Sequence, residues 1–214
     1  MKNTCILYRP VGLYEMEWIL NANASRFPPR KPEQPFFYPV LTHSYAQHIA
    51  REWNANNSDS GFAGFVTQFF VMQDYVDKHE EHTVGSSEHR ELWIPAESLD
   101  EFNRHIIGQV TIADAYYGNH YTGIIPEKFL LRERTATEQL IVLGDILEYN
   151  GMDFISEIIA HKTIIQLNFA YWKDYAFRPE DIAPEQREKI IQAITNVWRN
   201  KFPQTPLCGL PQAG

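Results

Sequence analysis

The sequence predicts an α+β fold in which a sheet-containing N-terminal part is followed by an all-helical C-terminal part. Two patterns carry this prediction. Up to about residue 118, short apolar and aromatic runs typical of strands alternate with segments of helical periodicity. From Thr135 onward the strand-like runs end, and apolar residues recur at helical spacing. We therefore expect a small mixed sheet within residues 1–118 and a helical extension over residues 119–214 that packs on it.

The expected strands share runs of apolar, β-branched and aromatic residues bounded by proline, glycine or polar turns. They are Cys5–Tyr8, Phe36–Leu41, Gly64–Met72, Arg90–Pro95 and Gly108–Tyr117. Pro39 places the second of these strands at a sheet edge or a bulge. In the fourth, strand alternation puts Leu92 and Ile94 on one side and Glu91 and Trp93 on the other.

Helices are expected between these strands, because apolar residues there recur every three or four positions. They cover Leu13–Ala24, a segment from Thr42–Ser44 to Trp53, Ser98–Ile107, and a short stretch within Asp74–Glu81. The segment 26–35 contains four prolines and is therefore expected to be an extended loop.

Helix-start signals organise the C-terminal part. Thr135 and Glu138 form a capping-box pair ahead of an apolar run. Asp153 is expected to cap one long helix that continues to about Trp172. Pro184 occupies a first-turn position for a last helix.

Composition narrows the class of protein. The chain has 214 residues and a formal net charge of −8, which disfavours broad nucleic-acid binding and adsorption to anionic lipid. It contains no apolar run of about 18 residues, so no membrane span is expected, and its first ten residues lack a signal-peptide core. Two cysteines, Cys5 and Cys208, exclude a disulfide scaffold. These observations predict a cytoplasmic protein with reduced thiols.

Common catalytic and nucleotide-binding signatures are absent. The sequence contains no G-x-G-x-x-G, no P-loop, no G-x-S-x-G and no H-E-x-x-H motif. His79 and His82 stand three residues apart and could offer two nitrogens to a metal, but a solvated charge cluster is the better interpretation of this segment. No resident metal is expected.

Three separated pieces of sequence suggest a nucleotide site. Arg9 ends the first strand, Tyr38 lies in the second, Tyr45 lies in the helix that follows the second strand, and Glu91 lies on the fourth. An arginine binds a diphosphate in a forked geometry, and an aromatic ring stacks on nicotinamide. A carboxylate hydrogen-bonds a ribose hydroxyl and stabilises a developing oxocarbenium charge. Together these groups would suit binding of NAD and cleavage of its nicotinamide–ribose bond, with Arg30 adding positive charge beside the cleft.

The same pieces resemble the ADP-ribosyltransferase-like fold. The resemblance rests on Leu7-Tyr8-Arg9, Tyr45-Ala46-x-x-Ile49-Ala50 and Glu91-Leu92-Trp93-Ile94-Pro95. Residues 5–118 also resemble uncharacterised bacterial proteins labelled "ADP-ribosylation/crystallin J1", through Phe27-Pro28-Pro29-Arg30, Phe37-Tyr38-Pro39-Val40 and Gly64-Phe65-Val66-Thr67. The resemblance implies a protein that binds NAD or ADP-ribose and acts as an ADP-ribosyltransferase or NAD glycohydrolase, with NAD as a substrate. Glu91 would be catalytic, and Arg9, Tyr38, Tyr45 and Arg30 would bind the nucleotide.

A second hypothesis is a non-catalytic interaction module of the same fold, an immunity or regulatory protein that binds a protein partner. The acidic surface and the aromatic-rich helical part favour it. Under this hypothesis Arg9 and Glu91 are structural strand residues. The first hypothesis predicts that these two side chains converge, and the second predicts an exposed apolar patch on one of the C-terminal helices.

Overall fold

The computed structural model describes residues 3–124, 131, 133–175, 177–178 and 180–210. The chain divides into two compact units, Met1–Tyr121 and Thr122–Gly214, so the boundary expected after residue 118 falls after Tyr121. In the described residues, unit 1 combines strands with short helices, and unit 2 consists of helices and connecting segments. The expected α+β class is therefore confirmed. None of the described helices is long and apolar enough to cross a membrane.

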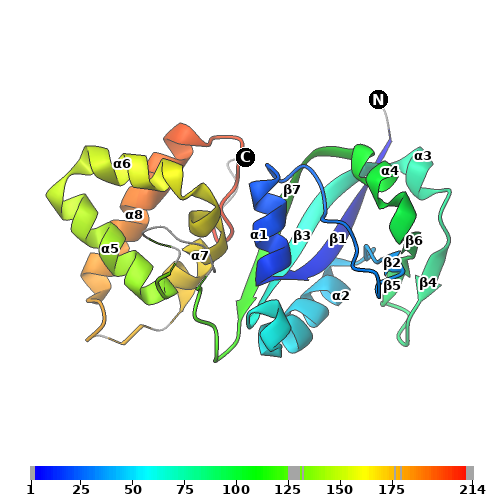
Figure 1. Cartoon of the computed structure of the whole chain (residues 1–214), viewed down its shortest axis with the longest axis horizontal. Helices are drawn as coiled ribbons and strands as arrows, with labels where there is room; N and C mark the ends of the chain where they lie inside the picture. The colour runs from blue at the N-terminus through cyan, green and yellow to red at the C-terminus, as the bar shows by residue number, and fades with distance from the viewer. Residues whose placement is uncertain (1–2, 125–130, 132, 176, 179, 211–214) are drawn as a thin grey trace. The chain divides into compact units, whose positions relative to one another are not determined.

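Unit 1 is built around a three-stranded sheet of order β1-β3-β7, formed by β1 (Thr4–Gly12), β3 (Ala63–Met72) and β7 (Ile106–Tyr117) (Figure 1). β1 pairs with β3 along its whole length, from Thr4 opposite Met72 to Gly12 opposite Gly64. Every strand pair among the described residues is antiparallel, so the sheet is not mixed as expected.

One short hairpin extends this sheet through one residue, and a second short ladder forms a separate two-stranded sheet. β2 (Phe36–Phe37) pairs with β6 (Ile94–Pro95), and β4 (Glu81–Thr83) pairs with β5 (Arg90–Leu92). Val40 exchanges two backbone hydrogen bonds with Tyr8 on β1, at N–O distances of 2.7 and 2.9 Å. On its other side, Val40 bridges to Glu91 on β5. Backbone pairing therefore continues from β7 through β3, β1 and Val40 to β5 and β4.

Helices cover both faces of the sheet. The helical segments of unit 1 are α1 (Leu13–Asn21), α2 (His43–His48), the π-helical turn η1 (Ile49–Trp53), η2 (Asn54–Asn56), η3 (Ser58–Ser60), α3 (Gln73–Val76), η4 (Ala96–Ser98) and α4 (Leu99–Arg104). On the first face, Leu7 and Val11 of β1 are buried. On the second face, Tyr8 packs against a buried cluster that includes Val66 and Tyr45 of α2. Strand alternation thus gives unit 1 two separate cores.

The second face depends on a close approach between β3 and η1. A Cβ atom on Gly64 would lie 1.9 Å from the carbonyl oxygen of Ala50, a distance that no side chain tolerates. Glycine at this position therefore lets the π-helical turn rest directly on the sheet backbone.

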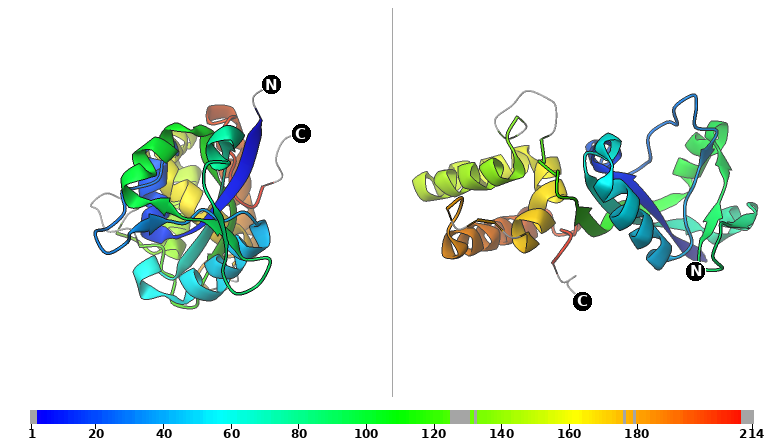
Figure 2. Two further views of the ribbon diagram at one scale, coloured as in Figure 1. Left: turned by 90° about the vertical axis from the view of Figure 1, so that its right-hand side faces the viewer. Right: turned by 90° about the horizontal axis from the view of Figure 1, so that it is seen from below.

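Unit 2 contains α5 (Ala136–Tyr149), α6 (Gly151–Ala160), α7 (Lys162–Asp174) and α8 (Pro184–Lys201), shown from further directions in Figure 2. The capping box of Thr135 and Glu138 is confirmed at the start of α5, and Pro184 begins α8 as predicted. The single helix expected from Asp153 to Trp172 is wrong. The chain leaves helical geometry at His161 (φ −108°, ψ 33°), which separates α6 from α7.

A buried amide network joins α5, α7 and the segment before α5. Gln139 is fully buried, and its Nε2 donates to the carbonyl oxygens of Leu131 and Arg134, each at 2.9 Å. Its Oε1 accepts from Nδ2 of Asn168 at 2.7 Å. Because both ends of this amide have partners, a polar side chain is accommodated in the core of unit 2.

Candidate functional site

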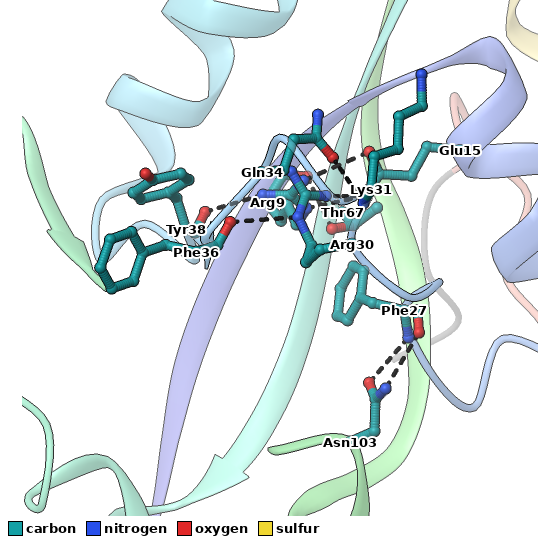
Figure 3. A network of polar contacts seen from close by, with 10 residues as sticks. All are labelled: Arg9, Glu15, Phe27, Arg30, Lys31, Gln34, Phe36, Tyr38, Thr67 and Asn103. Atoms are coloured by element: carbon teal, nitrogen blue, oxygen red, sulfur yellow. Dashed lines mark hydrogen bonds and ion pairs between the residues drawn. The ribbon is translucent and has the colours of Figure 1, made fainter. Parts of the chain in front are cut away.

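Arg9 points to the first face of the sheet, where its guanidinium is held on several sides. Its Nε donates to Oε1 of Glu15 on α1 at 3.0 Å, and its Nη1 donates to the carbonyl oxygen of Tyr38 at 3.2 Å (Figure 3). The same group lies over the Phe37 ring, 4.6 Å from the centroid. Only 9% of the Arg9 side chain is exposed. This geometry ties β1, α1 and the 36–38 segment together.

Arg30 comes from the proline-rich loop and meets the same carboxylate. Its Nε donates to the carbonyl oxygen of Phe36 at 3.2 Å, and its Nη1 lies 3.8 Å from Oε1 of Glu15. Burial lowers the pKa of Arg30, and the neighbouring charge of Arg9 lowers it further, while Glu15 partly offsets both effects. The structure therefore brings Arg9 and Arg30 together around one carboxylate, as parts of a buried ion-pair network.

Glu91 lies on the opposite face from Arg9. Directly opposed residues in antiparallel strands share a face, and Tyr8 opposes Val40, which in turn opposes Glu91. Arg9 follows Tyr8 and points the other way. The structure therefore does not bring Arg9 and Glu91 into one cleft. The expected convergence is wrong, because the 39–41 segment joins β1 through Tyr8.

The Glu91 carboxylate is surrounded by aromatic side chains. The residue is 9% exposed, and its Oε1 accepts a hydrogen bond from Nε1 of Trp93 at 2.8 Å. The Tyr38 ring lies edge-on to Trp93 with centroids 6.1 Å apart, and His82 stacks on the indole at 4.2 Å. We call Tyr38, His82, Glu91 and Trp93 the Glu91 cluster. Among the described residues, Oε2 of Glu91 accepts no hydrogen bond, which leaves it available to a ligand hydroxyl.

Tyr45 lies beside this cluster but is not open to solvent. It is 5% exposed, and its ring stacks on His89 with centroids 4.2 Å apart. Burial raises the pKa of Tyr45, and the negative charge of Glu91 raises it further. Tyr45 is nearly buried, whereas Trp93 is 40% exposed even with His82 stacked on it, so Tyr38 and Trp93 are the more accessible rings for the expected stacking.

A second polar group on the same face was not expected from the sequence. Nε2 of His43 lies 2.5 Å from Oδ2 of Asp114 on β7, and the His43 ring packs against Tyr8 with centroids 5.1 Å apart. Burial raises the pKa of Tyr8, and Asp114 raises it further. The alternation of β1 already placed Tyr8 opposite to Arg9, but nothing in the sequence indicated that Asp114 would reach the start of α2.

The second face thus offers a carboxylate with one open oxygen, two partly exposed aromatic rings and a histidine. Such groups can hold a planar ring and a ribose hydroxyl. No group of three or more histidine, cysteine or acidic side chains that could bind a metal gathers in the described part of the chain. No family model, curated protein or solved structure matches this chain.

Proposed function

We propose that unit 1 binds a nucleotide of the NAD or ADP-ribose class on the second face of its sheet, at the Glu91 cluster. The observation that carries this proposal is the Glu91 carboxylate, which is nearly buried among aromatic rings and has one oxygen that accepts no hydrogen bond from the residues that the structure describes. This oxygen remains accessible to solvent, so a ligand donor can take the place of water there. A ribose hydroxyl supplies such a donor, and the ring beside it supplies a stacking partner for Tyr38 or Trp93.

The reaction proposed for this site is cleavage of the nicotinamide–ribose bond. The C1′–N bond breaks with its electron pair leaving on nicotinamide, and the positive charge that develops on the ribose is stabilised by Glu91. Water or an acceptor nucleophile then bonds to C1′ and releases a proton, which gives either NAD glycohydrolase or ADP-ribosyltransferase activity. In this proposal Arg9 and Arg30 bind no phosphate of a ligand at the Glu91 cluster; they hold the sheet, α1 and the proline-rich loop together.

The test is a thermal-shift titration of the full chain with NAD and with ADP-ribose, in the wild type and in Glu91→Gln. A ligand present at a hundredfold excess over its Kd should stabilise the wild type by about 2.7 kcal/mol. Glu91→Gln should keep its fold and lose the shift. Glu97→Gln is the matched control, because Glu97 is an exposed carboxylate on the neighbouring turn η4.

Either of two results would contradict the proposal. One is the absence of any shift in the wild type with both ligands. The other is an equal shift in Glu91→Gln and Glu97→Gln, which would place binding away from the Glu91 cluster. Release of nicotinamide from NAD by the wild type but not by Glu91→Gln would establish the catalytic part of the proposal.

A further inference from the structure

We propose that the hairpin of α5 and α6 in unit 2 docks a basic segment of another protein, in which arginines or lysines alternate with apolar side chains. The surface is a groove of about 390 Å³ lined by Asp145, Ile146, Tyr149, Asp153 and Glu157. We call it the acidic groove. It lies within unit 2 and uses no residue of the Glu91 cluster, so it goes beyond the proposed nucleotide site.

Large apolar side chains are exposed where the two helices meet. Tyr149, at the end of α5, is 87% exposed, and Met152, in the first turn of α6, is 78% exposed. The inward side of α6 is already filled by Phe154 and Ile158, which are buried. Tyr149 and Met152 therefore add little to the core of unit 2, and their exposure is typical of residues that contact a partner.

Carboxylates around these side chains give the surface its charge. The segment 135–161 holds Glu138, Asp145, Glu148, Asp153 and Glu157 but no lysine or arginine. One cation balances part of this charge, because Nζ of Lys189 lies 3.9 Å from Glu148. Nε2 of His161 lies 3.2 Å from Glu157 and gives that carboxylate a ring-nitrogen partner.

Two carboxylates of the acidic groove remain unbalanced. Among the described residues Asp145 and Asp153 have no cationic partner, and Asp153 accepts one neutral hydrogen bond, from Nδ2 of Asn150 at 3.0 Å. Positive side chains of a partner would balance this charge.

The combination of charge and apolar area selects one kind of occupant. A second copy of the chain docked symmetrically would place acidic grooves against each other, and like charges at an interface are unfavourable. A nucleic acid is disfavoured by the same sign of charge. A basic segment satisfies the carboxylates, inserts an apolar side chain beside Ile146, and can place a guanidinium over the Tyr149 ring.

The experiment measures binding of a fluorescein-labelled peptide to the full chain by fluorescence anisotropy. The peptide is about 14 residues long, near the minimum length for helix formation, with leucines at helical spacing and arginines between them. A second peptide carries glutamate in place of each arginine. We expect the arginine peptide to bind, the glutamate peptide not to bind, and the affinity to fall as sodium chloride is raised from about 0.05 to 0.5 M.

Variants distinguish specific binding at the acidic groove from non-specific electrostatic attraction to an acidic protein. The double variant Tyr149→Ser, Met152→Ser keeps every carboxylate and alters only exposed side chains, so its fold should persist by circular dichroism. It should weaken arginine-peptide binding about tenfold or more, as loss of interface anchors does. Asp174→Asn, which removes an exposed carboxylate at the end of α7, should leave binding unchanged.

Three outcomes would overturn the proposal. The arginine peptide could fail to bind, or it could bind the double variant as tightly as the wild type. Alternatively, the chain could self-associate in analytical ultracentrifugation, with loss of that association in the double variant, which would assign the surface to a second copy. The nucleotide shift at the Glu91 cluster should be the same in the double variant, so the two proposals fail independently.

Discussion

Replacing Arg9 with methionine should destabilise unit 1 strongly, because the guanidinium is a structural clamp. Methionine keeps an apolar stem of similar length but removes the donors to Glu15 and to the Tyr38 carbonyl. An orphaned carbonyl oxygen costs about 1–3 kcal/mol, and a charge-assisted hydrogen bond contributes about 1.5–3 kcal/mol.

Two features of the network reduce the loss of stability expected for Arg9→Met. The Glu15 side chain is 24% exposed, so water replaces part of the lost pairing, and Arg30 remains 3.8 Å away. We therefore expect the free energy of unfolding of unit 1 to fall by about 2–4 kcal/mol.

The assay is urea unfolding read by pulsed hydrogen–deuterium exchange, so that peptides from β1 and β3 report unit 1 separately. With an m-value of about 2 kcal/mol/M, the midpoint should fall by about 1–2 M. Arg90→Met is the control, because its ion pair with Glu81 joins side chains that are 46% and 49% exposed, and it should change stability by less than about 1 kcal/mol. A change in Arg9→Met as small as in the control would refute the clamp. If Arg9→Met kept its stability but lost the thermal shift with nucleotide, the result would instead assign Arg9 to the ligand site.

Four further substitutions test other parts of the structure. Gly64→Ala should lower the free energy of unfolding by about 3 kcal/mol or more in urea, because the methyl group would overlap the backbone of η1. Gly151→Ala, where a Cβ atom meets open space, should be neutral or stabilise by up to about 1 kcal/mol. Burial lowers the pKa of His79 below its unfolded value of 6.5, so its contribution to stability is present above pH 6.5 and is lost as the pH falls through the folded pKa. His79→Phe should therefore flatten the stability profile below pH 6.5 in chemical unfolding, and an unchanged slope would contradict this. Gln139→Leu should destabilise unit 2 by about 2–3 kcal/mol in the same assay, since it removes the acceptor for Nδ2 of Asn168 and the buried donor to two carbonyl oxygens, and a neutral result would show that the buried network contributes nothing.

Local patterns predicted most of the elements and the orientation of the side chains along each strand. The alternation around Glu91 is confirmed, with Leu92 and Ile94 fully buried on one side and Glu91 and Trp93 on the other. The capping box at Thr135 is a local hydrogen-bonding motif, so it too was visible in the sequence. These features depend on neighbours within a few residues.

The arrangement of the candidate site depended on contacts that no local pattern contains. Arg9 and Glu91 share a sheet, but which face each occupies is set by the pairing of Tyr8 with Val40. A shift of one residue in that pairing would have reversed the outcome. In the same way, the contact between His43 and Asp114 joins residues far apart in the chain, and the break at His161 interrupts a continuous apolar periodicity.

The pairing at Val40 is the place where the extended sheet of unit 1 should separate first. β1 is bonded to β3 along nine residues, whereas the strand segment carrying Val40 is joined to β1 through a single residue pair. Sub-global unfolding should therefore begin by separating the β4–β5 hairpin, which carries Glu91, from an intact β1-β3-β7 core. The backbone amides of Tyr8 and Val40 should lose protection from solvent exchange before those in the middle of β3. A ligand that contacts both the β4–β5 hairpin and the β1-β3-β7 sheet would stabilise this junction against opening. Its binding should therefore slow amide exchange at Val40.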